Sequence, residues 1–188
     1  MKIKTVMGLI LQVVTALLIF GMTMNCFAEA VKWYEHPGYW FKNVFYSPAN
    51  GSLSPEIKAV DLKGNKKSFN DYSSQYILLS FWASWCPPCM KELPQLEKLE
   101  SKYSDNDFKV LALNVHDTKE DSLKFIEKHK LKLTYLLDIE GATVNNFAIS
   151  PIPTNFLIHK ESNKIIQKWQ GKNDVAEIEL FLNDLIRK

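Results

Sequence analysis

The sequence has little cysteine: its 188 residues include three, at positions 26, 86 and 89. Exported proteins held together by a disulfide framework are much richer in cysteine, so that class is excluded. A structural zinc site needs four ligands, usually two close cysteine pairs or one pair with regularly spaced histidines. The histidines are instead scattered, at His36, His116, His129 and His159. We therefore expect no metal site and no cofactor.

An excess of one charge is also missing. The chain has 23 Lys and Arg residues against 21 Asp and Glu residues, and no basic run is interleaved with aromatic side chains. This pattern argues against a nucleic-acid partner. Internal repeats and low-complexity segments are absent as well. The hydrophobic fraction of 46% and the charged fraction of 23% are typical of a globular domain with a real core.

One long apolar run stands at the N-terminus. Lys2 and Lys4 precede an apolar stretch over residues 6–24, and Cys26-Phe27-Ala28 offers small residues for cleavage after Ala28. We predict that residues 1–28 are a signal peptide. Retention as a membrane anchor is the alternative, because the run is long enough to cross a bilayer. Either way the folded part is exported, to the periplasm or the extracytoplasmic face of the membrane.

The next segment, residues 29–55, is an aromatic-rich lead-in without a clean period. Packing against the domain is its favoured role, and a membrane-interface belt is the alternative if the anchor is retained. Residues 56–188 then form the predicted domain, in which strand and helix patterns alternate. An N-terminal hairpin over residues 56–69 comes first, and a second hairpin over residues 154–169 precedes the last helix, which Asp174 caps. The pattern predicts an α/β fold with helices on both faces of a sheet.

The two remaining cysteines form a Cys-x-x-Cys motif within Trp85-Cys86-Pro87-Pro88-Cys89. The apolar run over residues 76–82 predicts a buried strand before the motif, and apolar residues at helical spacing over residues 88–103 predict a helix after it. A helix N-terminus stabilises a thiolate, which is the nucleophile in thiol–disulfide exchange. The motif therefore predicts a redox dithiol. A c-type haem site would need histidine where Met90 stands, and an inert disulfide would close too small a ring to stabilise much.

The segments over residues 81–89 and 149–158 resemble the active site and the cis-proline segment of the thioredoxin fold. From about Pro55 onward the chain is similar to the TlpA/ResA-type exported thiol–disulfide oxidoreductases, which include the cytochrome c maturation thioredoxins. The resemblance implies a central mixed β-sheet flanked by helices. It also implies dithiol–disulfide exchange with protein partners, in which Cys86 is the nucleophile and Cys89 resolves the mixed disulfide.

The same resemblance implies that Pro153 is the cis-proline that faces the pair, although alone it would be read as an ordinary trans turn. X–Pro bonds reach the cis state far more cheaply than other peptide bonds. A cis bond would turn the backbone of Ile152 outward, where it can pair with an extended partner segment. The expected substrate-binding residues are Trp85, Pro87, Pro88, Ile152, Pro153 and Thr154.

Two positions bear on proton transfer. Ser80 stands where thioredoxin has a buried aspartate, so this chain lacks that carboxylate. Glu92 matches the helix glutamate of the ResA-type proteins, and its i, i+3 spacing puts it on the helix face of Cys89. A partly buried carboxylate there would have a raised pKa and could act as acid and base for the resolving thiol. The alternative is a solvated helix glutamate.

The direction of exchange is open at this point. We favour a reductant that keeps apocytochrome c or other exported thiols reduced and is fed by a membrane electron donor, because exported compartments are oxidising. A disulfide-installing oxidase would use the same residues, and a copper-handling assembly factor would use the pair as soft ligands. Pro87-Pro88 and the Ser-Pro-Ile before Pro153 both depart from the better-marked haem-maturation proteins.

Overall fold

A seven-stranded mixed sheet organises the computed structural model, which describes residues 48–103, 107–171 and 175–186. The predicted signal peptide, most of the aromatic lead-in and the predicted cap Asp174 lie outside these residues. The strand order is β2-β1-β5-β4-β3-β6-β7. The strands are β1 (Ala59–Asp61), β2 (Lys66–Lys67), β3 (Tyr76–Trp82), β4 (Phe108–Asn114), β5 (Thr134–Leu137), β6 (Thr154–His159) and β7 (Lys164–Gln170).

The central strands β3 and β4 are nearly continuous apolar runs and are buried on both sides. Such runs are typical of parallel strands covered on both faces. β3, β4 and β5 are indeed parallel, and β6 and β7 complete one side of the sheet as an antiparallel hairpin. β1 and β2 form the predicted N-terminal hairpin, which joins the other side by pairing β1 antiparallel to β5. The C-terminal ends of the parallel strands therefore lie together.

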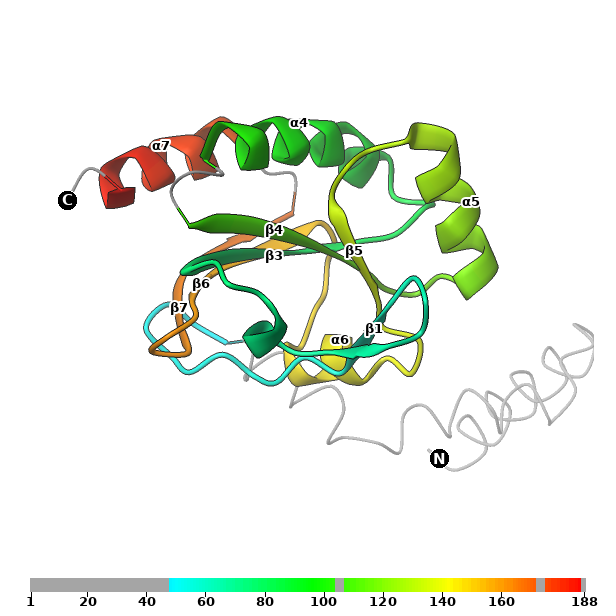
Figure 1. Cartoon of the computed structure of the whole chain (residues 1–188), viewed down its shortest axis with the longest axis horizontal. Helices are drawn as coiled ribbons and strands as arrows, with labels where there is room; N and C mark the ends of the chain where they lie inside the picture. Colours follow the sequence, from blue (N-terminus) through cyan, green and yellow to red (C-terminus); the bar gives the residue numbers. More distant parts are fainter. Residues whose placement is uncertain (1–47, 104–106, 172–174, 187–188) are drawn as a thin grey trace, which may run out of the picture. The chain divides into compact units, whose positions relative to one another are not determined.

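Helices cover both faces of the sheet (Figure 1). The buried side chains of α4 (Pro87–Tyr103), α5 (Lys119–His129) and α7 (Val175–Ile186) share one hydrophobic core. On the other face, α6 (Ala142–Asn146) and the short 3₁₀ helix η1 (Phe69–Asp71) contribute to a second core. This is the α/β thioredoxin-like fold that the sequence predicts.

The first hairpin is shorter than predicted. The predicted second strand extends to residue 69, whereas β2 ends at Lys67. The reason is local, because the backbone N–H and the hydroxyl of Ser68 both donate to the carboxylate of Asp71, at 2.6 and 3.0 Å. This reciprocal capping turns the chain into η1 and takes Phe69 out of the strand.

The described end of the lead-in runs beside β7. Gly51 donates to the carbonyl of Ile165 at 2.7 Å, and Ile165 donates to Ser52 at 2.9 Å. A single bridge then pairs Leu53 with Lys164. These bonds occupy part of the β7 edge, which would otherwise present unpaired backbone groups. Within the part of the chain that the structure describes, no helix is both long and apolar enough to cross a bilayer.

Candidate active site

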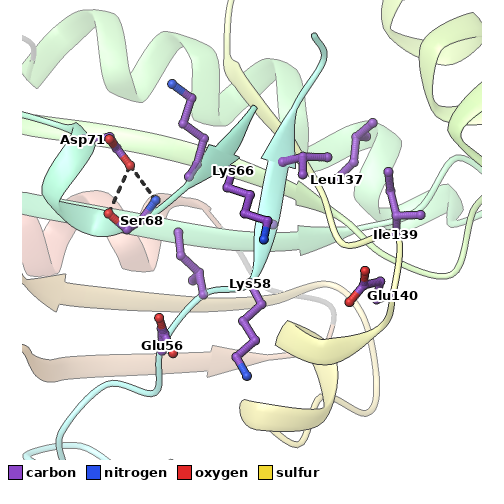
Figure 2. A pocket seen from close by; sticks show the side chains of 12 residues that line it. Glu56, Lys58, Lys66, Ser68, Asp71, Leu137, Ile139 and Glu140 are labelled. Carbon is purple, nitrogen blue, oxygen red and sulfur yellow. Dashed lines mark hydrogen bonds between the residues drawn. The ribbon is translucent and has the colours of Figure 1, made fainter. Parts of the chain in front are cut away.

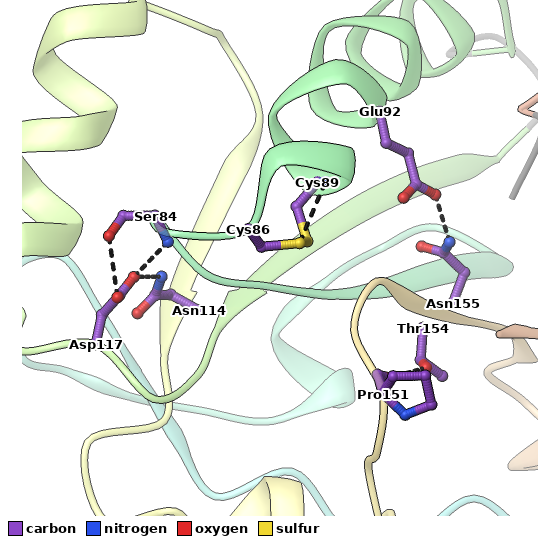
Figure 3. The surroundings of a disulfide bond; sticks show 9 residues. All are labelled: Ser84, Cys86, Cys89, Glu92, Asn114, Asp117, Pro151, Thr154 and Asn155. Carbon is purple, nitrogen blue, oxygen red and sulfur yellow. Dashed lines mark hydrogen bonds between the residues drawn. A yellow bond between two sulfur atoms is a disulfide. The ribbon is translucent and has the colours of Figure 1, made fainter. Parts of the chain in front are cut away.

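The two cysteines lie at the junction between the end of β3 and the start of α4, as the sequence predicts, and are joined by a disulfide. Both residues are buried, at 2% and 1% of their accessible surface. Their neighbours Trp85, Pro87 and Pro88 are exposed, and Trp85 retains 59% of its surface. The predicted contact residues of the motif are thus exposed, whereas the two cysteines that form the disulfide are buried. Figure 3 shows this disulfide at the start of α4.

One backbone donor points at the sulfur of Cys86. The N–H of Cys89 donates to that sulfur at 3.3 Å, whereas the N–H of Met90 is used within the helix, on the carbonyl of Cys86 at 3.1 Å. The first two helical residues, Pro87 and Pro88, have no N–H at all. A helix N-terminus normally offers several free N–H groups. At this one, a single N–H remains for the Cys86 sulfur.

A hydrogen-bonded anchor holds the turn in front of Cys86. The carboxylate of Asp117 accepts from the backbone N–H of Ser84 at 2.7 Å and from its hydroxyl at 3.0 Å (Figure 3). The same carboxylate accepts from the side-chain amide of Asn114 at 2.6 Å, and Asn114 accepts from Ser122 of α5. Sequence reasoning missed this anchor, because its members come from separate segments that only the pairing of β3 with β4 brings together.

The second predicted segment lies at the same end of the sheet, because Thr154 at the start of β6 pairs with Phe81 near the end of β3. The Ile152–Pro153 bond is cis, so that prediction is confirmed, and the Ser150–Pro151 bond is cis as well. Ile152 is half-buried and Pro153 is buried. The side chain of Thr154 is fully buried and donates to the carbonyl of Pro151 at 2.6 Å. The buried Thr154 side chain therefore holds the loop before β6 in place through its hydrogen bond to Pro151.

Glu92 is buried on the helix face that also buries Cys89, with 5% of its surface exposed. Burial raises the pKa of its carboxyl from 4.5 to about 7, although a hydrogen bond from Asn155 works in the opposite direction. Of the two alternatives for Glu92, the structure thus has the buried one, and the direction of its pKa shift agrees with that expectation. Its role in proton transfer is a separate question, because burial alone does not make a carboxyl catalytic.

Asn155 is the partner of Glu92 that sequence reasoning missed. Its side-chain nitrogen Nδ2 donates to Glu92 Oε1 at 2.5 Å, and the residue is fully buried in β6. The register places Asn155 directly opposite Ser80 of β3, the position where the resemblance implies that a buried aspartate is missing. The one feature of the sequence that could have pointed to Asn155 is that it is a lone amide in the otherwise apolar run after Thr154.

No cluster of three or more potential metal ligands occurs in residues 48–103, 107–171 and 175–186. A groove of about 640 Å³ lies elsewhere, along β1, β2 and the loop after β5 (Figure 2). None of its lining residues belongs to the site around the disulfide. Its lining mixes lysines with carboxylates, namely Lys58, Lys66, Lys67, Glu56, Asp71 and Glu140, so its charge favours no one class of ligand.

Comparison with known proteins gives the relatives of this chain. The sequence model of the AhpC/TSA family matches residues 51–168. The chain is 34% identical to thiol-disulfide oxidoreductase ResA of Geobacillus kaustophilus, over 68% of this chain and 74% of that protein. It is 30% identical to ResA of Bacillus thuringiensis subsp. konkukian, over 72% and 78% of the two chains. A crystal structure described as a thiol:disulfide interchange protein DsbE from Chlorobium tepidum superposes with a TM-score of 0.66, at 27% identity, over 74% of this chain and 97% of that one.

Replacing Glu92 by glutamine tests the buried carboxyl. The folded-state pKa of about 7 lies above the ordinary 4.5, so the folded protein holds a proton that the unfolded chain has released. The stability that the carboxyl contributes is therefore complete below pH 4.5 and is lost as the pH rises through 7. Between these values, wild-type stability should fall relative to Glu92→Gln by about 1.4 kcal/mol per pH unit.

Urea unfolding of the oxidised proteins from pH 4 to pH 9 measures this difference, because the disulfide keeps both cysteines from titrating. Glu127→Gln, on an exposed position of α5, is the matched control. Parallel stability curves for the wild type and Glu92→Gln across this range would contradict the assigned burial of the charge.

Proposed function

The chain belongs to the AhpC/TSA family and is a thiol–disulfide oxidoreductase of the ResA type, and on that premise we propose that it reduces disulfides in exported protein partners through Cys86 and Cys89. The observation that carries the proposal is the position of the pair, at the N-terminus of α4 with one N–H directed at the Cys86 sulfur. This geometry favours a thiolate at Cys86 over one at Cys89.

The proposed exchange conserves electrons between the two pairs. In the reduced protein, the Cys86 thiolate attacks one sulfur of the partner's disulfide. The partner's S–S bond breaks, a mixed disulfide forms, and the other partner sulfur leaves as a thiolate that takes up a proton. Cys89 then attacks the Cys86 sulfur and releases the second partner thiol. The partner gains two electrons and two protons, and the protein is left with the Cys86–Cys89 disulfide.

Glu92 is the proposed base of the second step. Cys89 must lose its proton before it attacks, and it is too deeply buried to give that proton directly to water. The carboxyl of Glu92 lies on the same face of α4, and its pKa of about 7 suits proton uptake near neutral pH. Ser80, at the position of the missing aspartate, cannot take this role because a hydroxyl is not a base at that pH.

The proposed docking surface joins the exposed residues of the motif to the loop before β6. Trp85, Pro87 and Pro88 offer apolar contact next to the sulfurs. Among the described residues, neither the N–H nor the carbonyl of Ile152 has a hydrogen-bond partner. An extended partner segment could therefore pair with this backbone, with Pro153 and the buried Thr154 side chain holding the loop in place.

The two prolines of the motif support the reductive direction. A pair becomes oxidising when its reduced form is stabilised, and thiolate stabilisation by helix N–H groups is one source of this. The two prolines leave only the N–H of Cys89 on the Cys86 sulfur, and of the two missing groups the one at Pro88 is the one that could reach that sulfur. The thiolate is therefore less stabilised than the helix would otherwise allow, which favours a more reducing pair.

The partners and the location belong to the same proposal. Residues 1–28 would export the domain or anchor it at the extracytoplasmic face of the membrane. A membrane donor of the thiol-transfer type would return electrons to the pair, since the compartment is oxidising. Exported proteins with oxidised cysteine pairs, apocytochrome c among them, are the proposed substrates.

The reduction potential of the Cys86–Cys89 pair tests the direction of exchange. Equilibration of the full chain in a redox buffer should give about −270 mV or lower, in the range of thioredoxin. A value near −120 mV, in the range of DsbA, would instead identify a disulfide-installing oxidase.

The roles of the two cysteines are tested by single substitutions. Cys89→Ser should accumulate a mixed disulfide with an oxidised model substrate, whereas Cys86→Ser should form none.

Pro88→Ala tests the role of the missing N–H groups. It restores a donor at the second helical position, from which a backbone N–H can reach the side chain that precedes the helix. The Cys86 thiol should then lose its proton about one pKa unit lower, and the potential should rise. Alkylation rates of the reduced protein against pH measure this. Pro87→Ala is the matched control, because an N–H at the first position is not aimed at that side chain. Equal shifts in both variants would contradict the argument.

A further inference from the structure

The side-chain amide of Asn155 has two polar atoms, and only one of them has a partner. Nδ2 donates to Glu92 Oε1 at 2.5 Å, whereas the amide oxygen Oδ1 is buried without a hydrogen-bond partner. A buried acceptor without a partner carries a free-energy cost, and native proteins tolerate few of them. The unpartnered oxygen belongs to the same amide that binds the buried carboxyl of Glu92. That carboxyl is therefore the candidate donor for Oδ1.

Figure 3 shows how the two groups lie. The bonded oxygen of Glu92 faces the nitrogen of Asn155, and the remaining oxygen of each group lies on the side of the disulfide in this view. A carboxylate has no proton to give to Oδ1, but a carboxylic acid has one. A protonated Glu92 can therefore donate to Oδ1 while it still accepts from Nδ2, which makes a paired arrangement of acid and amide.

We propose that Asn155 is a positioning residue of the proton relay, and that its amide holds Glu92 in both protonation states. The carboxylate accepts one hydrogen bond from Nδ2 and is the base that takes up the proton of Cys89. The acid that forms on proton transfer keeps this bond and gains a second one to Oδ1. The proton moves from the Cys89 sulfur to Glu92, and no group other than the thiol and the carboxyl changes its protonation. This inference rests on the proposed role of Glu92.

The surroundings of Glu92 leave Asn155 as its main polar contact. Asn155 is paired in register with Ser80 of β3 on one side and with Trp169 of β7 on the other. Neither side chain carries a charge. Lys168, the neighbouring cation of β7, contacts the ring of Phe156, which belongs to the core on the opposite face of the sheet. Among the described residues, no charged side chain shifts the pKa of Glu92, for which burial and the Asn155 hydrogen bond are the two causes.

The carboxamide fits this task better than other side chains of its size. Leucine would leave the carboxylate in an apolar pocket without a donor. Aspartate would place a second negative charge against the first, which raises the pKa of one of them strongly. Only a side chain that both donates and accepts can serve the carboxylate and the acid alike, and the amide does so with two separate atoms.

The test titrates Glu92 directly in wild type, Asn155→Leu and Asn155→Ser. Carboxyl-labelled glutamate followed by ¹³C NMR in the oxidised protein gives the Glu92 titration without interference from the cysteines, and Glu92→Gln assigns the signal. In N155L the carboxylate loses a hydrogen bond to a charged acceptor, whereas the acid loses weaker bonds between neutral groups, so the Glu92 midpoint should rise, by about one pH unit. N155S, whose hydroxyl both donates and accepts but sits one bond farther from Glu92 than Nδ2, should restore the wild-type midpoint only in part.

The resolving step gives the second readout. A mixed disulfide at Cys86 is formed with a small thiol reagent, and the rate at which Cys89 displaces it is followed against pH. A rise of one unit from a midpoint near 7 lowers the carboxylate fraction at pH 7, so the rate should fall about fivefold in N155L and recover at higher pH. In the Glu92→Gln background, Asn155→Leu should cause no further shift of the pH profile. N155A, which lacks the same two atoms, replaces N155L if that variant does not fold.

The outcomes separate the two proposals. An unchanged Glu92 midpoint in N155L would overturn the role of Asn155, whether or not the protein exchanges disulfides. A shifted midpoint with an unchanged resolving profile would also overturn it, because Asn155 would then be a structural partner only. If Glu92→Gln itself left the resolving profile unchanged, the proposed relay would fail, and the role of Asn155 would fail with it, although exchange at Cys86 would still stand.

Discussion

The packing of α4 on the sheet is the interaction on which the rest of the site depends. Its apolar face, with Leu93 and Leu96 at helical spacing, is buried against β3 and its neighbours. That burial fixes the helix N-terminus at the end of β3, where the N–H of Cys89 meets the Cys86 sulfur. It also carries Cys89 and Glu92 into the interior, since both lie on the packed face. Redox pair and proton acceptor are therefore placed by one hydrophobic contact.

The same contact sets a conflict between stability and chemistry. Removing an ionised carboxylate from water is costly, and the fold offsets this cost only in part, by a single hydrogen bond from Asn155. A solvated glutamate would be more stable but would remain fully ionised at neutral pH. The cost of burial is thus the physical source of a pKa near 7, which a group that must both take and release a proton requires. The anchor from Asp117 to Ser84 steadies the other side of the pair, so that the turn before Cys86 does not depend on the helix alone.

Much of this could be predicted from the chain, because the informative signals are local. The apolar run of β3, the cysteine spacing and the i, i+3 position of Glu92 all act within one strand and one helix. What could not be predicted depends on tertiary pairing. Asn155 meets Glu92 only because β6 lies antiparallel to β3, and Asp117 meets Ser84 only because β4 lies parallel to it. The end of β2 was missed for another reason, since a side-chain cap at Ser68 competed with the strand pattern.

The double proline gives the site a second means of control that is independent of the carboxyl. Glu92 acts on the proton of Cys89, and so on the rate of resolution, whereas the N–H groups at the helix N-terminus act on the thiolate of Cys86, and so on the equilibrium of the pair. With one N–H left at the Cys86 sulfur, the fold stabilises the thiolate just at one point. Replacing Pro88 should therefore change the reduction potential without changing the pH at which Glu92 titrates. Replacing Asn155 should change the Glu92 titration without changing the reduction potential. The two sides of the disulfide are controlled by different elements, the first turn of α4 for one sulfur and the α4–β6 contact for the other.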